Sequence, residues 1–265
     1  YDALHEDALA TFPAFGVNQF AQYALMAGTF DVPVVMLAQG VGPLRDPSAR
    51  RLARHVFDSA LAGSLRDDAS AALLRDIGSG TAWPIAPDPA WAWTGASAAP
   101  LAPAHVDPAL AARPVLAVVL RDWPFHPAWE DHVVEAIGKA LPPEWGCLWI
   151  DFHRDPDDAD RRSAFVQRLV ARLPGIHAEW TGETLEEAGA LIAGSDAVLA
   201  MRLHGVLMAG LAGRPVVALE YDHKVTALAD AIGMPEGQRV PLEAISTRLP
   251  GALAAICGSG CSDAF

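Results

Sequence analysis

The sequence predicts an α/β protein built on parallel β-sheets, and three observations support this fold class. Short apolar runs alternate with segments of helical spacing along the second half of the chain. Several of these runs end in a charged or titratable residue just before the next helix begins. The chain has 265 residues, of which 52% are hydrophobic, which suffices for two buried cores. Strands that alternate with helices in this way specify a doubly wound parallel sheet.

The first half of the chain is expected to form an N-terminal domain over residues 1–100. Its expected elements are a helix over 17–27, a strand over 32–38, a helix ending near 62, a short strand ending at Arg66 and a helix over 69–77. The strand over 32–38 is a continuous apolar run, which is typical of a strand buried on both faces. Residues 1–16 lack a strand followed by a glycine-rich turn, so this domain is expected to be incomplete.

A linker is predicted from about residue 83, with the domain boundary near residue 100. Repeated prolines in this segment block helix continuation and favour extended backbone. Trp91 and Trp93 lie in it, and two interpretations stay open. Their rings either stack on a sugar or fill a gap between the domains.

The C-terminal domain, residues 101–265, shows the alternation most clearly. Expected strands cover 115–120, 147–150, a short stretch near 176, 197–200 and 216–219. Expected helices cover 126–141, 158–173, 185–193, 203–212 and 225–232. Thr184 with Glu187 forms a capping box for the third of these helices. A final helix over 242–256 is expected to return to the first domain.

Composition excludes several classes of function. The formal net charge of −13 argues against nucleic acid as a partner, because most of the surface would repel phosphates. The three cysteines are too few for a disulfide framework, and the histidines show no metal-ligand spacing, so no bound metal is predicted. A Walker loop and a convincing GxGxxG motif are absent, which argues against ATP and NAD. Without a long apolar stretch or a signal segment, the sequence indicates a cytoplasmic protein.

Cations and a histidine recur where predicted strands end. Arg202 and His204 follow the strand over 197–200, Lys224 follows the next strand, and Arg66 and Arg121 end two earlier ones. The carboxyl ends of parallel strands meet at one edge, where open α/β sheets bind ligands. A basic crevice of this kind suits a small polyanion. The alternative for each arginine is a simple ion pair with an acidic loop residue.

His204 is the candidate acid/base. A histidine in water has a pKa of about 6.5, so its imidazole exchanges protons near neutral pH. A lone histidine near a helix start is otherwise a core residue, and its cationic neighbours favour the catalytic interpretation here.

Two C-terminal segments, SDAVLAMRLHG (195–205) and GRPVVALEYDHKV (213–225), resemble the signature of the polysaccharide pyruvyl transferases, with the CsaB-like cell-wall branch as the nearest match. Upstream, QGVGPL (39–44), LRDDAS (65–70), DPA (88–90) and VLRDW (119–123) match the family's ordered blocks. The resemblance covers about residues 32–235. Two departures are the missing N-terminal glycine-rich segment and Gly205 in place of the commoner alanine, a change from which we expect no consequence.

This resemblance implies a fold similar to GT-B glycosyltransferases, with two Rossmann-like domains facing a cleft. It implies transfer of the pyruvyl group of phosphoenolpyruvate to a sugar as a ketal, with release of phosphate and no cofactor. In the CsaB-like branch the acceptor is a β-N-acetylmannosamine residue of a lipid-linked precursor, so contact with the inner membrane face is expected. The polymer made there anchors S-layer-homology proteins.

For this chemistry, Arg66, Arg202 and Lys224 are predicted to hold the carboxylate and the phosphate. Arg121 is predicted to contact either the donor or the acceptor, and His204 to move the proton. Two alternatives remain open at this point. One is a GT-B glycosyltransferase or sugar epimerase that uses a nucleotide sugar, and the other is a non-catalytic two-domain protein that binds an anion.

Overall fold

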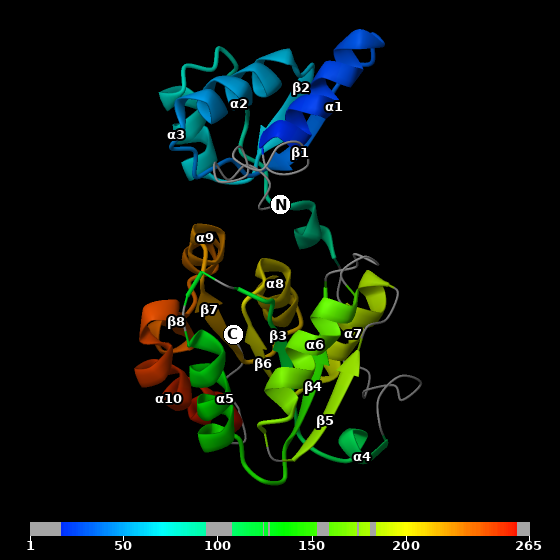
Figure 1. The fold of residues 1–265 in the computed structure, drawn as a ribbon, viewed down its shortest axis with the longest axis vertical. Helices are drawn as coiled ribbons and strands as arrows, with labels where there is room; N and C mark the ends of the chain where they lie inside the picture. Colours follow the sequence, from blue (N-terminus) through cyan, green and yellow to red (C-terminus); the bar gives the residue numbers. More distant parts are fainter. Residues whose placement is uncertain are drawn as a thin grey trace. The chain divides into compact units, whose positions relative to one another are not determined.

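A computed structural model describes residues 17–93, 108–123, 125–126, 128–152, 159–173, 175–180 and 184–258. The chain divides into two compact units, Tyr1–Ala92 and Trp93–Phe265 (Figure 1). The boundary expected near residue 100 falls in 94–107, which lies outside the described residues.

The first unit contains a small parallel sheet with helices packed against it. In chain order its elements are α1 (Val17–Thr29), β1 (Val35–Gln39), α2 (Pro47–Ser59), β2 (Ala62–Leu65), α3 (Asp68–Asp76) and the 3₁₀ turn η2 (Pro89–Ala92). β1 and β2 run parallel, with Val35 opposite Ala62. The order of helices and strands is the one that the sequence predicted. Asp67 caps α3, since its carboxylate accepts a hydrogen bond from the amide of Ser70.

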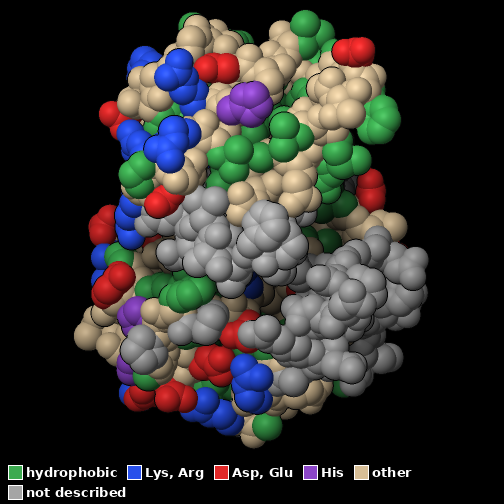
Figure 2. Space-filling view, turned by 45° about the horizontal axis from the view of Figure 1, so that its top comes forward, with side chains coloured by type: hydrophobic (Ala, Val, Ile, Leu, Met, Phe, Trp, Pro, Cys, Tyr) green, Lys and Arg blue, Asp and Glu red, His purple; other side chains and the backbone are tan. Residues whose placement is uncertain are grey.

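The expectation that the first strand is buried on both faces is wrong. Met36 packs among Phe20 and Leu52 of the helices α1 and α2. Val35 and Leu37, which point to the opposite face, are 57% and 70% exposed. Among the described residues, helices cover only the Met36 face of β1. An apolar run does not show whether one or both faces of a strand are covered, so the sequence could not predict this. Figure 2 shows hydrophobic side chains on the surface of this unit.

The second unit is a doubly wound sheet of six parallel strands in the order β5-β4-β3-β6-β7-β8. Its strands are β3 (Val115–Val119), β4 (Gly146–Ile150), β5 (Ile176–Trp180), β6 (Ala197–Ala200), β7 (Val216–Glu220) and β8 (Arg239–Pro241). Its helices are α4 (Pro108–Ala111), α5 (Trp129–Ala140), α6 (Ala159–Val170), α7 (Leu185–Gly194), α8 (Leu203–Leu211), α9 (His223–Ala231) and α10 (Ile245–Cys257). Strand order runs outward from β3 to β5 on one side and from β6 to β8 on the other. The direction in which successive strands are added therefore reverses between β3 and β6, as in the Rossmann fold.

Helices cover both faces of this sheet. On one face α5, α6 and α10 pack against alternate strand residues such as Leu116, Leu199 and Val217. On the other face α8 packs between α7 and α9 and contacts β6 and β7 (Figure 1). Strands β3, β4 and β6 are buried throughout, as their continuous apolar runs predicted. β8 was not predicted, because three residues carry too short a pattern.

The last helix has its apolar face in the core of the second unit. Its predicted return to the first domain stays a prediction. Leu249, Leu253 and Ile256 of α10 belong to the core cluster that α5 completes. The apolar stripe of a helix shows that it packs, and only the tertiary structure shows on which surface.

Trp93 opens the second unit and packs on α7. A Cβ placed on Gly189 would lie 2.2 Å from Trp93 Cζ2, so the missing side chain leaves the notch that this ring fills. Trp91 stays partly exposed at 38%. Trp93 therefore fixes the start of the second unit against helix α7 of the same unit.

Within the described part of the chain, each helix is too short or too polar to cross a membrane.

Candidate functional site

Four of the five predicted site residues lie at one edge of the six-stranded sheet. Arg121 follows β3, Arg202 and His204 follow β6, and Lys224 follows β7. β3, β6 and β7 are neighbours and run parallel, so their carboxyl ends meet at the same edge. The strand order reverses between β3 and β6, and in open α/β sheets the ligand crevice lies outside the carboxyl ends of the strands at such a reversal. The structure thus places these four residues at one edge of the sheet, as the sequence predicted.

Arg202 and His204 occupy the start of helix α8. Arg202 is the N-cap residue, with extended backbone at φ −84° and ψ 133°, and its side chain makes no capping hydrogen bond. His204 lies in the first turn and is exposed, so its imidazole does not point into the apolar core. The first amides of a helix have no partners within the helix and attract anions. An arginine, a histidine and a helix N-terminus thus occupy one strand end.

Gly205 lets this helix start lie close to the sheet. A Cβ on Gly205 would lie 3.0 Å from Val119 Cγ1 and 3.2 Å from Ala200 Cβ. Val119 is fully buried in the central strand β3, so it has little room to move. The glycine therefore has a packing role, which the sequence alone did not predict.

Lys224 is held by the start of helix α9. Asp222 caps α9, because its carboxylate accepts a hydrogen bond from the Lys224 amide at 3.1 Å. The Lys224 ammonium lies 3.5 Å from the same carboxylate and 5.6 Å from the ring centroid of Tyr221. Its side chain is 12% exposed, so the ammonium does not extend into open solvent.

Arg121 belongs to an aromatic cluster that connects the ends of β3 and β7. Its guanidinium carbon lies 5.4 Å from the ring centroid of Trp123 and 5.9 Å from that of Tyr221. The two rings meet edge to face, with centroids 4.8 Å apart and planes at 76°. Trp123 and Tyr221 were not among the predicted site residues. Their positions just after two strands, beside predicted cations, were the signal that could have found them.

Arg66 lies at the corresponding edge of the small sheet in the first unit. It follows β2 directly, and its amide donates to the carbonyl of Gln39 at the end of β1. Its guanidinium lies over Gly40, where a Cβ would be only 2.4 Å from Arg66 Nη2. Its Nε donates to Asp67 Oδ2 at 3.3 Å, and both side chains are 18% exposed.

Asp67 connects Arg66 to the loop after β1. The hydroxyl of Ser70 donates to Asp67 Oδ1 at 2.6 Å and accepts from the amide of Val41 at 2.9 Å. Burial by itself would raise the pKa of Asp67, but the hydrogen bonds from Ser70 and the nearby Arg66 guanidinium together lower that pKa below its usual value. Asp67 is therefore ionised at neutral pH, and the network fixes the loop on which Arg66 rests.

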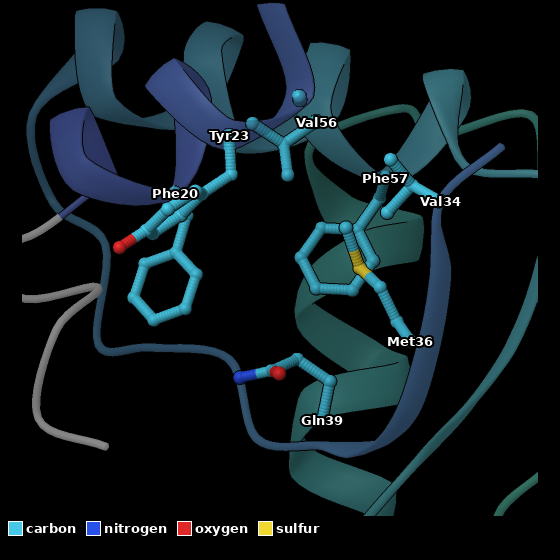
Figure 3. Close-up of a pocket in the computed structure, with 8 residues that line it drawn as sticks. Phe20, Tyr23, Val34, Met36, Gln39, Val56 and Phe57 are labelled. Atoms are coloured by element: carbon cyan, nitrogen blue, oxygen red, sulfur yellow. The ribbon is translucent and has the colours of Figure 1, made fainter. Parts of the chain in front are cut away.

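An apolar pocket lies in the first unit, between α1, α2 and β1 (Figure 3). Its lining residues are Phe20, Tyr23, Ala24, Val34, Met36, Gln39, Val56 and Phe57. The amide of Gln39 faces the cavity (Figure 3), and the lining includes no charged group. This pocket therefore lacks the cations that an anionic ligand needs. The described ranges also contain no group of three or more His, Cys, Asp and Glu residues that could hold a metal ion.

Solved structures with similar folds show to which fold class the chain belongs. The structure of Anabaena Alr3699/HepE in complex with UDP-glucose matches with a TM-score of 0.55 and 14% identity, over 92% of this chain and 72% of that one. The UDP-GlcNAc 2-epimerase of Methanocaldococcus jannaschii matches with a TM-score of 0.51 and 12% identity, over 92% of this chain and 68% of that one. At these identities the likeness shows the fold alone, which is the Rossmann-like GT-B fold.

The family follows from sequence comparison. A sequence model described as polysaccharide pyruvyl transferase matches residues 10–223, and the chain belongs to this family. It is also 26% identical over 257 residues to AmsJ of Erwinia amylovora, an amylovoran biosynthesis protein. That match covers 89% of this chain and 60% of AmsJ, so the chain spans about three fifths of the length of that relative.

Proposed function

We propose that this chain transfers the pyruvyl group of phosphoenolpyruvate to a sugar of a polysaccharide precursor, as a ketal, with release of phosphate. One observation carries the proposal. In a chain that belongs to the pyruvyl transferase family, Arg121, Arg202, His204 and Lys224 lie at one edge of a parallel sheet. This edge combines fixed positive charge with a group that can donate a proton, which is what the reaction requires.

Cations are needed because the donor carries a carboxylate and a phosphate. Arg202 stands at a helix N-terminus, where backbone amides add to its own charge, and Lys224 stands at the next strand end. We assign these two residues, with Arg66 from the first unit, to the two anionic groups. Arg121 is assigned to a further donor contact or to the acceptor. None of these cations has to titrate during turnover.

We assign the proton transfer to His204. A protonated imidazole would give its proton to the methylene carbon, and the adjacent carbon would become cationic. One acceptor hydroxyl then attacks that carbon and loses its proton, the carbon–oxygen bond to phosphate breaks, and a second hydroxyl closes the ketal ring. The proton of the first hydroxyl restores the imidazolium, and that of the second leaves with the phosphate, so His204 ends as it began.

The proposal extends to the identity of the acceptor. We assign a β-N-acetylmannosamine residue of a lipid-linked precursor as the acceptor, which would bring the enzyme to the inner face of the membrane. The support is the resemblance of residues 195–205 and 213–225 to the cell-wall branch of the family. The role of that polymer in anchoring S-layer-homology proteins belongs to the same proposal.

The test is to incubate the protein with phosphoenolpyruvate and a synthetic N-acetylmannosaminyl acceptor. Phosphate release that depends on the acceptor, with the mass increment of a pyruvyl ketal on the sugar, is the expected result. A parallel titration with UDP-sugars addresses the glycosyltransferase and epimerase alternatives. Transfer or epimerisation of a nucleotide sugar, without any reaction of phosphoenolpyruvate, would contradict the proposal. Binding of phosphoenolpyruvate without phosphate release from any acceptor would favour a non-catalytic anion-binding protein.

A further inference from the structure

Tyr221 contacts two of the predicted cations at once. Its ring centroid lies 5.9 Å from the guanidinium carbon of Arg121 and 5.6 Å from the ammonium nitrogen of Lys224. Arg121 follows β3 and Lys224 follows β7, and β6 lies between these two strands. One aromatic ring therefore links cations from two strands that are not neighbours.

A ring holds a cation differently from a carboxylate. The attraction comes from the negative face of the ring, so the cation is oriented while its positive charge is not cancelled. Asp222 supplies one carboxylate to Lys224, at 3.5 Å, and Tyr221 supplies the aromatic contact to both cations.

Trp123 holds the Tyr221 ring in place. The edge-to-face contact between the two rings, at 4.8 Å and 76°, is the favoured arrangement of an aromatic pair. Both rings are partly buried against the core of the second unit. Trp123 also contacts Arg121 at 5.4 Å, so the two rings and the guanidinium form one packed group.

We infer that Tyr221 is a positioning residue for the donor site: it holds Arg121 and Lys224 in the arrangement that binds phosphoenolpyruvate, with its ring and not its hydroxyl. This inference rests on the proposed function. It predicts that donor affinity depends on an aromatic side chain at this position.

The experiment measures phosphoenolpyruvate binding by calorimetry in the full chain and in variants. Tyr221→Leu removes the ring and is expected to weaken binding about 5- to 30-fold, the range between a good exposed cation–ring contact and a desolvated one. Tyr221→Phe keeps the ring and should bind within about 2-fold of the wild type. In turnover assays the same ring loss should raise KM for phosphoenolpyruvate more than it lowers kcat.

Arg168→Gln is the matched control. Arg168 on α6 lies 5.7 Å from the ring of Phe165 and forms an ion pair with Glu130 at 3.2 Å, so this variant removes a cation–ring contact and an ion pair elsewhere in the same unit. Phosphoenolpyruvate binding should not change. A change as large as that of Tyr221→Leu would overturn the inference, because the effect would then not be specific to the site.

The outcomes separate the inference from the proposed function. A wild-type protein that does not bind phosphoenolpyruvate overturns both. If the wild type binds and Tyr221→Leu binds equally well, the inference fails and the proposed function stands. Equal losses in Tyr221→Leu and Tyr221→Phe also overturn it, since the hydroxyl would then be the active group. If Tyr221→Leu does not fold, Trp123→Leu tests the same claim, with weaker binding expected and unchanged binding contradicting it.

Discussion

His204 is the residue on which the proposed chemistry depends. A positioned acid/base contributes about 10²–10⁴-fold to a rate, so His204→Ala should lower kcat by that factor. The side chain is exposed, and its loss should change the free energy of unfolding by less than about 0.5 kcal/mol. Steady-state phosphate release and thermal unfolding together check both statements.

The control for this prediction is His55→Ala, which removes an exposed histidine from α2 in the first unit. It should leave kcat unchanged. Near-normal turnover by His204→Ala would show that another group moves the proton.

Gly40 is a second single-residue test, because the absence of its side chain makes room for Arg66. Gly40→Ala would place a methyl group 2.4 Å from Arg66 Nη2, and the flexible guanidinium would have to move. If Arg66 binds the donor, KM for phosphoenolpyruvate should rise about 10-fold, the value of one hydrogen bond to a charged group. The fold should persist, since the displaced atoms are the end of a long side chain.

Gly80→Ala serves as the comparison for that variant, since a Cβ at Gly80 meets nothing within 4 Å. Its kinetics should match the wild type. An unchanged KM in Gly40→Ala would argue that Arg66 does not contact the donor.

At the scale of the element, helix α8 offers two glycines with opposite expectations. Gly205→Ala would overpack against Val119, which costs about 1–3 kcal/mol and exceeds the gain in helix propensity of at most about 1 kcal/mol. The protein should become less stable. Gly210 has open space around its Cβ position, so Gly210→Ala should stabilise the protein by about 0.5–1 kcal/mol.

Urea unfolding of the two variants measures this difference. A Gly205→Ala protein as stable as Gly210→Ala would show that Val119 yields easily and that α8 does not depend on the close approach.

The elements show what periodicity can and cannot predict. The strands β3, β4, β6 and β7 were predicted because central parallel strands are apolar throughout. The exposure of Val35 and Leu37 in β1 was not, because an apolar run looks the same whether one face or both are covered. The packing of α10 on α5 was also missed, since amphipathicity does not name the partner surface.

The shared position of the candidate site residues was predictable where residue type and strand end coincide. Arg121, Arg202, His204 and Lys224 could be selected because parallel strands bring their carboxyl ends to one edge. Tyr221 and Trp123 carry a weaker signal of the same kind, their positions after two strands and beside predicted cations. An aromatic residue there is more often part of the core, and the contact of two cations with one ring is visible only in the structure.

At the scale of the whole molecule, two buried thiols report on the integrity of the second unit. Burial raises the pKa of the Cys147 thiol to about 12, and burial followed by the charge of Asp196 raises that of Cys257 to about 12. Both thiols are protonated and inaccessible at pH 8. In a Cys261→Ser background, labelling of these two cysteines should be at least about 100-fold slower in the native state than in urea. Rapid native labelling would contradict the packing of α10 against the sheet.

The same pKa shifts set the direction of a pH effect. A thiol whose folded pKa lies above its unfolded value contributes stability that is present below about pH 9 and is lost as the pH rises toward 12. The free energy of unfolding should therefore decrease on going from pH 8 to pH 11. Cys147→Ala should reduce that decrease relative to the wild type, and an equal decrease in both would show that other groups cause it.

The central claim is that the edge formed by the ends of β3, β6 and β7 binds the donor. A crystal structure of the protein with phosphoenolpyruvate tests it most directly. We predict that the phosphate and the carboxylate lie against Arg202, Lys224 and the first amides of α8, with the methylene carbon facing His204. Phosphoenolpyruvate bound at another surface of the second unit, with this edge unoccupied, would contradict the account.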